Sequence, residues 1–272
     1  LKITLLNDAS FLKSKLLIIQ LNNRDSRVND IFASICANIV NSVIDATSEK
    51  EGVRLVTIQM RRWKDLFSKR RNQKLSAQEQ QGLFGELFFL RKLLLSPIDK
   101  ASSTGFWVGP EMAPKDFQGD MWAVEVKTTV AYSHSNIAIN GELQLDESDT
   151  DKLYLYHLVV EALPQDGETL PEIIASIRQM LKGDIKAASL FESKLMLAGY
   201  FDLDEDSYKE CHYHIRKEQY FQVRDEFPRI KKDELKMGVS EVKYNISLNY
   251  SSENKVIEKN VINSIESYEG NK

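Results

Sequence analysis

The sequence predicts a mixed α/β (α+β) protein in which a central β-sheet is flanked by helices. Three observations support this class. Amphipathic helical stretches fill much of the first third, alternating apolar and polar stretches follow in the middle, and both kinds recur after residue 165. This order of helices and sheet segments is typical of a domain built from mixed layers. The 272 residues suffice for one large domain, or for a core domain with a smaller accessory region.

Residues 1–75 are predicted to form an N-terminal α/β accessory region. Residues 2–6 and 14–21 are rich in Leu and Ile, which indicates two short strands. Residues 27–47 and about 51–70 have the apolar spacing of amphipathic helices.

Residues 76–250 are predicted to form the core, and residues 251–272 a polar tail that frays. A capping box, formed by Ser76 with Glu79, begins the first core helix, and Pro97 marks its end. The remaining expected elements are a loop at 98–113, strands at about 114–118, 121–130, 135–140 and 152–161, a helical stretch at about 171–196 that breaks near Gly183, and strands within 213–227 and 241–250.

The composition excludes several classes of protein. Hydrophobic residues make up 42% and charged residues 28%, as in folded rather than disordered chains. The longest apolar runs are far shorter than a membrane span, so no membrane partner is expected. The two cysteines, Cys36 and Cys211, give neither a disulfide framework nor a thiolate metal site, which fits a reducing, cytoplasmic location. The net charge of −4 argues against a non-specific nucleic-acid coat protein.

The segment "MWAVEVKTT" (121–129) carries charge within a predicted strand. Because alternate side chains of a strand share a face, Glu125 and Lys127 point in the same direction. A salt bridge alone would explain Glu125 and Lys127. Whether they belong to a catalytic site depends on the acidic residues near them.

The turn "QGD" (118–120) before this strand has Gly at its centre and predicts a hairpin. If the hairpin pairs Asp116 with Ala123, Asp116 lies diagonally opposite Glu125 on the same face. A register one residue different would turn Asp116 away and make Asp120 the better candidate.

The preceding helix adds a third acid. Glu86 follows the spacing of Leu83, Leu90 and Leu93, so it lies on the apolar side of this helix. A buried carboxylate needs a compensating partner, which is either an Arg or Lys ion pair or a metal site.

Three acids and a lysine that converge would suit metal-assisted hydrolysis of a phosphodiester. Mg²⁺ (or Mn²⁺) prefers carboxylate oxygens, and it lowers the pKa of a bound water. A lysine beside that water orients it or stabilises the charge that develops on the phosphate.

The order of these residues resembles the PD-(D/E)xK nuclease superfamily, and more narrowly an uncharacterised bacterial branch of PD-(D/E)xK motif proteins. The matching segments are "GLFGELFFL", "WVGP", "KDF", "VEVKTT", "QL…LYLYHLVV" and "QVRDEFPRI". The resemblance spans most of the chain, and it implies a restriction-endonuclease-like core with a central mixed sheet.

The resemblance implies that Asp116 and Glu125 bind Mg²⁺, with Lys127 at the attacking water and Glu86 as the acid of the first core helix. Lys115 separates Pro114 from Asp116, so the "PD" pair is interrupted and the choice between Asp116 and Asp120 stays open. Gln144 either matches a polar position that some branches place near the site, or is a capping or surface residue, which we favour.

The segment "RRWKDLFSKRRNQK" (61–74) is strongly basic. We favour a solvated helix face for it. The alternative is a surface that contacts the DNA backbone through Arg61, Arg62, Lys69, Arg70 and Arg71, with further contacts around Arg229, Lys231 and Lys232.

These observations favour a metal-dependent DNA endonuclease, with duplex DNA as its partner. The resemblance places it in bacterial restriction or phage defence. A non-catalytic DNA-binding or assembly subunit of a multi-protein defence system is the alternative, and it would act with partner proteins. A homodimer would suit a nuclease that cuts both strands.

Overall fold

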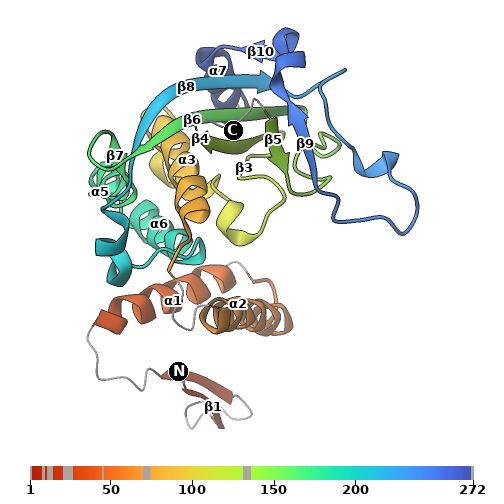
Figure 1. Ribbon diagram of the computed structural model, residues 1–272. Helices are drawn as coiled ribbons and strands as arrows, with labels where there is room; N and C mark the ends of the chain where they lie inside the picture. Colours follow the sequence, from red (N-terminus) through yellow and green to blue (C-terminus); the bar gives the residue numbers. More distant parts are fainter. Residues whose placement is uncertain are drawn as a thin grey trace. The chain divides into compact units, whose positions relative to one another are not determined.

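The computed structural model describes residues 2–7, 10, 15–20, 27–44, 46–69, 74–130 and 136–270. The chain divides into two compact units, Leu1–Ser68 and Lys69–Lys272 (Figure 1). Every helix in the described part of the chain is too short or too polar to cross a membrane.

The first unit contains a two-stranded antiparallel sheet and two helices. The elements are β1 (Lys2–Asn7), β2 (Lys15–Gln20), α1 (Arg27–Val43) and α2 (Glu49–Lys69). Trp63 of α2 is buried, and its indole N–H donates to the Asn38 side chain of α1 over 3.3 Å. The strands and helices expected in this region are confirmed.

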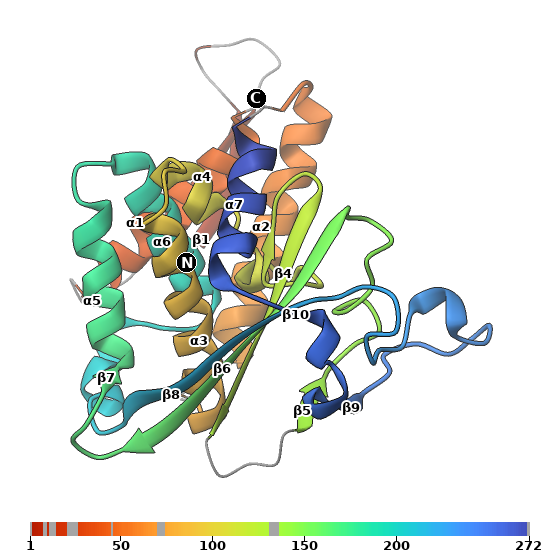
Figure 2. The same cartoon turned by 90° about the horizontal axis from the view of Figure 1, so that it is seen from above.

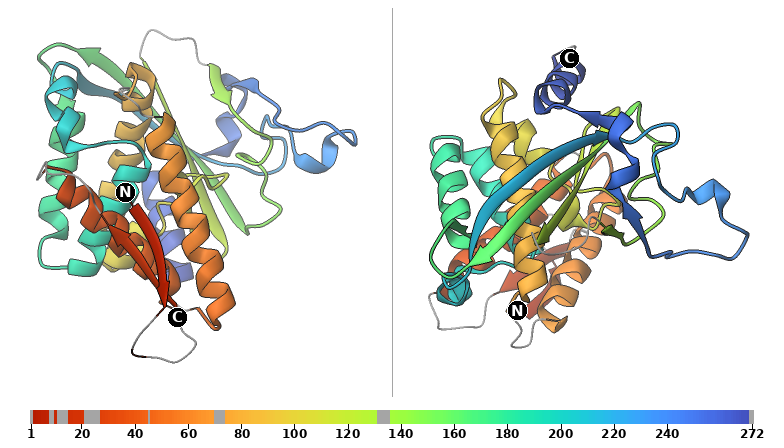
Figure 3. Two further views of the ribbon diagram at one scale, coloured as in Figure 1. Left: turned by 90° about the horizontal axis from the view of Figure 1, so that it is seen from below. Right: turned by 45° about the horizontal axis from the view of Figure 1, so that its top comes forward.

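The second unit is built on a mixed six-stranded sheet in the order β10-β8-β6-β4-β3, with β7 also pairing with β8. Its strands are β3 (Phe117–Gln118), β4 (Trp122–Val130), β6 (Lys152–Leu163), β7 (Glu168–Thr169), β8 (His212–Gln222) and β10 (Lys255–Val256). Strands β4 and β6 are parallel, while the other neighbours are antiparallel. Figure 3 shows β6 and β8 as long, bent strands.

Helices cover one face of this sheet. They are α3 (Ala77–Leu94), α4 (Lys100–Gly105), α5 (Leu170–Leu181), α6 (Ile185–Leu197) and α7 (Glu258–Glu269). Val124, Val126, Tyr154 and Tyr156 point into the core under these helices. The capping box of Ser76 and Glu79 begins α3 as expected, because each satisfies a main-chain N–H of the other.

A two-stranded antiparallel sheet of β5 (Asn136–Ile139) and β9 (Tyr244–Ser247) covers part of the opposite face, away from α3, α5 and α6 (Figure 2). Ala123, Leu155 and Phe221 pack into the smaller core beneath it. Since β4 alternates, Glu125 and Lys127 belong to the Ala123 face rather than to the helix-covered face. The expected central mixed sheet flanked by helices is confirmed.

Two expectations for connecting segments were wrong. Residues 98–113, expected as a loop, contain α4 and a 3-10 turn at Gly109–Glu111, because the Asp99 side chain caps the Ser102 N–H. The tail expected to fray is ordered in its described part, residues 251–270, where it forms β10 and α7 and buries Val261 and Ile265.

The other boundaries differ by small shifts. The helical stretch breaks near Gly183 as expected, where φ is +95°. The strand expected at 241–250 is shorter, because Leu248–Tyr250 forms a 3-10 turn. The remaining 3-10 segments are Asp202–Tyr208, Lys232–Glu234 and Ser252–Asn254.

Candidate active site

The candidate site lies at the edge of the sheet, beside the start of β3 at Phe117. Strand β3 pairs with β4 only at Phe117–Val124 and Gln118–Ala123, so β4 has no β3 partner from Glu125 onward. Glu125 and Lys127 project from this stretch, and the Lys127 ammonium is 2.8 Å from Glu125 Oε1. Glu125 is 1% exposed and the Lys127 side chain 14%, so the pair is buried with one side accessible.

Asp116 reaches this edge by a register different from the expected one. Ala123 pairs with Gln118 rather than with Asp116. The difference is two residues, and a shift of two preserves the face on which a side chain lies. Asp116 Oδ2 accepts the main-chain N–H of Val126 over 2.8 Å, in place of a β3 carbonyl. Asp116 is therefore fixed beside Glu125.

Asp120 does not join this group. It is exposed in the turn between β3 and β4. Lys115, which interrupts the expected "PD" pair, is buried, and its ammonium contacts Asp149 over 2.9 Å. The interruption therefore serves a separate contact and does not displace Asp116.

Glu86 approaches the same edge from α3. Its Oε2 accepts the indole N–H of Trp107 over 2.7 Å. Leu83, Leu90 and Leu93 are buried, as the apolar spacing of this helix predicts. Among the contacts described for Glu86, the hydrogen bond comes from an indole rather than from an arginine.

Gly109 lies against two of the acids. A Cβ atom at Gly109 would stand 2.9 Å from Asp116 Oδ1 and 3.1 Å from Glu86 Oε2. Both oxygens therefore face the same small volume above a residue that has no side chain. Gly109, the Gly in "WVGP", thus leaves room for the two carboxylates where a side chain would collide with them.

Burial raises the pKa of all three carboxyl groups, and repulsion by Asp116 adds to this at Glu125 and Glu86. Burial, followed by the Asp116 carboxylate, raises the pKa of Glu125 to about 8 against the opposing effect of Lys127. The same two causes raise the pKa of Glu86 well above its usual value, although the Trp107 hydrogen bond opposes them. Burial also raises the pKa of Asp116. Like charges held this close indicate a site prepared for a cation.

Lys127 remains charged in this environment. Burial lowers the pKa of its ammonium, but Glu125, Asp116 and Glu86 together raise it by more, so the net shift is upward. Gln144 Oε1 accepts both from Lys127 Nζ over 2.9 Å and from the Asn140 N–H over 2.8 Å. Gln144 thus caps a turn, as favoured from the sequence, and also holds Lys127.

The residues present fit a hard divalent cation. The converging side chains offer only oxygen donors, and Glu125 Oε2 is buried without a hydrogen-bond partner. No group of three or more His, Cys, Asp or Glu side chains in the described part of the chain is already gathered as a metal site. The carboxylates are thus neighbours rather than a preformed cage, and Glu125 is paired with Lys127.

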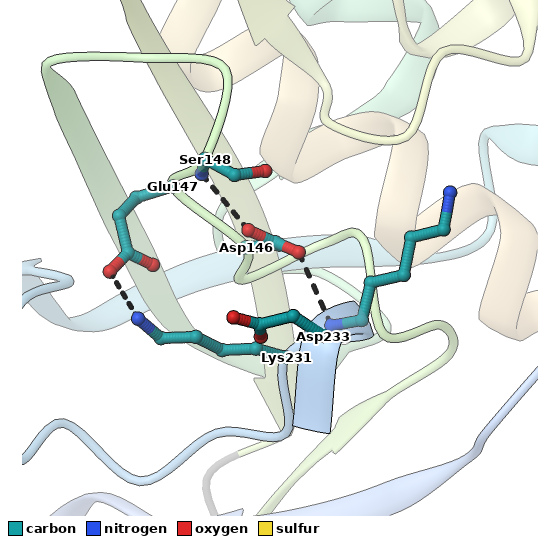
Figure 4. Close-up of a pocket in the computed structure, with 6 residues that line it drawn as sticks. Asp146, Glu147, Ser148, Lys231 and Asp233 are labelled. Atoms are coloured by element: carbon teal, nitrogen blue, oxygen red, sulfur yellow. Dashed lines mark hydrogen bonds and ion pairs between the residues drawn. The ribbon is translucent and has the colours of Figure 1, made fainter. Parts of the chain in front are cut away.

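The loop that carries Gln144 is anchored by charged contacts around a pocket of about 420 Å³ (Figure 4). Lys231 contacts Glu147 over 2.6 Å, and Asp146 accepts the Lys232 N–H over 3.3 Å. Arg229 also contacts Glu147, and its side chain is only 4% exposed. The expectation that Arg229 contacts DNA was wrong, because its guanidinium is buried.

The expected DNA-contacting residues at the start of the chain are only partly described. Arg61 is exposed and Arg62 half-buried on α2. Arg70, Arg71 and the side chain of Lys69 lie outside the described residues. A role for this patch in binding DNA stays a prediction.

Two supporting residues were missed from the sequence. Trp107 appeared only as part of the motif "WVGP", because its contact with Glu86 joins residues 21 positions apart. Lys194 of α6 is buried, and its ammonium donates to the carbonyls of Gly105 and Trp107 over 2.7 and 2.5 Å. Its signal was a lysine within the apolar run "SKLML" (193–197).

Comparison with protein families matches residues 1–249 to family DUF4420, described as "Putative PD-(D/E)XK family member". The mixed sheet with its helices is consistent with a restriction-endonuclease-like fold. Comparison with curated proteins gives no match, and neither does comparison with solved structures.

Proposed function

The chain belongs to the PD-(D/E)XK family DUF4420, and from this premise we propose that it is a DNA endonuclease that hydrolyses phosphodiester bonds with Mg²⁺ or Mn²⁺. The observation that carries the proposal is that Asp116 and Glu86 face one small volume over Gly109, beside the Glu125–Lys127 pair at the strand edge. The family resemblance supports a setting in bacterial restriction or phage defence.

Asp116 and Glu125 would hold the cation, with Glu86 as a third oxygen donor. A divalent cation would neutralise charge on the phosphate and lower the pKa of the water bound to it. Because the pKa values of the carboxyl groups are raised, a cation competes with the protons that they hold, and its binding would release those protons.

Lys127 acts on the phosphate by charge rather than as a base. Its raised pKa keeps the ammonium protonated, so it has no lone pair with which to accept a proton. Glu125 and Gln144 each hold Lys127 Nζ, which fixes the position of the positive charge. A fixed ammonium stabilises the negative charge that builds up on the phosphate oxygens as the bond breaks.

The test is cleavage of plasmid DNA, single-stranded DNA and RNA with Mg²⁺, with Mn²⁺ and with a chelator. We expect metal-dependent cleavage of DNA by the wild type, and a loss of about 100-fold or more in Lys127→Ala and Glu125→Ala. Lys186→Ala, at an exposed position on α6, is the matched control and should keep wild-type activity.

The alternative of a non-catalytic DNA-binding or assembly subunit gives a different result. In that case the wild type would bind DNA and show no metal-dependent cleavage of any of the three nucleic acids. That outcome would refute the endonuclease proposal.

A further inference from the structure

The sheet face that carries Glu125 and Lys127 continues beyond the cover of β5 and β9 as a polar surface. Thr129 follows Lys127 on the same face of β4, and His157 is the register neighbour of Lys127 on β6. Gln219 is in turn the register neighbour of His157 on β8. Thr129 and Gln219 are half-buried and Lys217 is exposed, so part of this surface is accessible to a ligand.

His157 is buried beneath this surface, between Thr129 of β4 and Gln219 of β8. It is 5% exposed, and its Nε2 lies 2.8 Å from Thr129 Oγ1. Its Nδ1 is buried, and no described group meets it with the distance and angle of a well-formed hydrogen bond. Burial lowers the pKa of His157 to about 4, with a side-chain hydrogen bond to Gln219 opposing the shift and the Lys217 ammonium adding to it, so the ring is neutral at neutral pH.

The unpartnered Nδ1 indicates which tautomer is present. A neutral imidazole carries one proton, and the other ring nitrogen is an acceptor. A proton on Nδ1 would create a buried N–H without an acceptor, which is rarer in proteins than an unsatisfied lone pair. We therefore assign the proton to Nε2, which then donates to Thr129 Oγ1.

This tautomer determines what Thr129 can do. Because Thr129 Oγ1 accepts from His157, its own hydroxyl proton is free to be donated to another group. The Cα atoms of Lys127 and Thr129 are separated by about 6.6 Å along the strand. This spacing is comparable with that of consecutive phosphates along an extended nucleic-acid strand.

We propose that the Thr129 hydroxyl, oriented by His157, binds the backbone phosphate of nucleic acid next to the one held at Lys127. The proposal rests on the proposed nuclease function, because it takes Lys127 to mark the scissile phosphate. Lys217 lies on the same face, separated from Thr129 by Val159 of β6, and adds positive charge beside this subsite. The contact positions a strand and does not read its sequence.

Binding measured without cleavage tests the subsite. The probe is a short fluorescein-labelled DNA duplex, titrated by anisotropy with Ca²⁺ in place of Mg²⁺. We expect Thr129→Val to weaken binding by about tenfold, the effect of losing one hydrogen bond to a charged group. Thr129→Ser should bind as the wild type does.

Thr128→Val is the matched control. The Thr128 hydroxyl belongs to the opposite face of β4, is buried without a partner, and faces Gly85 of α3. Its loss should leave the binding of the duplex unchanged. Equal binding by Thr129→Val and Thr128→Val would overturn the subsite.

The role of His157 has its own readouts. His157→Gln keeps a donor near the Nε2 position and should bind DNA like the wild type, whereas His157→Leu should resemble Thr129→Val. Nitrogen-15 NMR of the folded protein should show a neutral ring protonated on Nε2. A ring protonated on Nδ1 would overturn the proposal whatever the binding result.

Failure of the subsite can be told apart from failure of the proposed function. If the wild type cleaves DNA and the two valine variants bind equally well, only the subsite proposal is refuted. If the wild type binds DNA without cleaving it and Thr129→Val binds more weakly, the endonuclease proposal is refuted and the subsite proposal is supported. If the wild type binds no DNA duplex, both proposals are refuted.

Discussion

Trp107 donates its indole N–H to the carboxylate of Glu86 over 2.7 Å, and this contact joins the segment before β3 to helix α3. The ring of Trp107 is fully buried, so the donor has a fixed direction. One oxygen of Glu86 is thereby oriented beside Asp116. Trp107 is thus a positioning residue for the acid cluster.

Replacing Trp107 with Phe should weaken the binding of Mg²⁺ or Mn²⁺. The variant keeps an aromatic ring but loses the N–H, and loss of a supporting hydrogen bond typically costs about 10–100-fold in metal affinity. Calorimetric titration of each cation measures it. Trp122→Phe is the matched control, because that indole donates to Glu269 over 3.0 Å. Equal losses of affinity in the two variants would contradict the role of Trp107.

Replacing Gly109 with Ala should impair the site without removing a charged group. The added Cβ would stand 2.9 Å from Asp116 Oδ1, closer than real Cβ contacts, so a carboxylate must move. A displacement of this kind can cost about 100-fold in rate. The initial rate of plasmid cleavage measures the loss.

The control for this substitution is Gly82→Ala. Gly82 is on α3, the helix that carries Glu86, and a Cβ there would meet no heavy atom within 4 Å. It should leave cleavage unchanged and stabilise the helix by about 0.5–1 kcal/mol. Wild-type cleavage by Gly109→Ala would show that the two carboxylates tolerate displacement.

Strand alternation was enough to place Glu125 and Lys127 together, because it depends only on local geometry. The register of the hairpin was wrong by two residues, yet Asp116 kept its face, because the side-chain period is also two. The prediction that Asp116 joins Glu125 therefore survives an error of two residues in the predicted strand register.

The supporting contacts depend on segments far apart in the chain. Glu86 meets Trp107 across 21 residues, and Lys194 meets Trp107 across 87. No short-range pattern encodes such meetings. Helix α7 does have a local signal, because Val261 and Ile265 are four residues apart and lie on one helix face. The polar composition of the tail nevertheless led to the prediction that it frays.

Glu125 should make the metal-free protein less stable as the pH rises. Its pKa is about 8 in the folded state against an ordinary value of 4.5, so the folded state binds more protons between these values. The contribution to stability is therefore complete below about pH 4.5 and is lost as the pH rises through about 8. Glu125→Gln should reduce this slope in urea denaturation measured across the range.

The same group links pH to the cation. Mg²⁺ competes with the proton on Glu125, so the stabilisation by Mg²⁺ should increase with pH across this window in the wild type. Glu253→Gln, at an exposed position, should keep both the wild-type slope and the Mg²⁺ effect. An identical pH slope in wild type and Glu125→Gln would show that Glu125 does not titrate in this range.

Lys194 should have the opposite pH dependence. Burial lowers the pKa of its ammonium to about 8 from an ordinary value of 10.5, so the unfolded state binds more protons between these values. The contribution of Lys194 to the free energy of unfolding should rise with pH across that range. Lys194→Met should lose this rise, and it leaves the carbonyls of Gly105 and Trp107 without their donor. We expect a loss of about 1–3 kcal/mol in the free energy of unfolding at pH 7.

Urea denaturation at pH 7 and at pH 9 measures both effects. Lys186→Met, at an exposed position on the same helix, should change the free energy of unfolding by less than about 0.5 kcal/mol.

Because Lys194 also holds the carbonyl of Trp107, Lys194→Met should weaken Mg²⁺ binding, as Trp107→Phe does. Wild-type Mg²⁺ affinity in Lys194→Met, with stability lowered, would restrict Lys194 to the packing of α6 and separate it from the acid cluster.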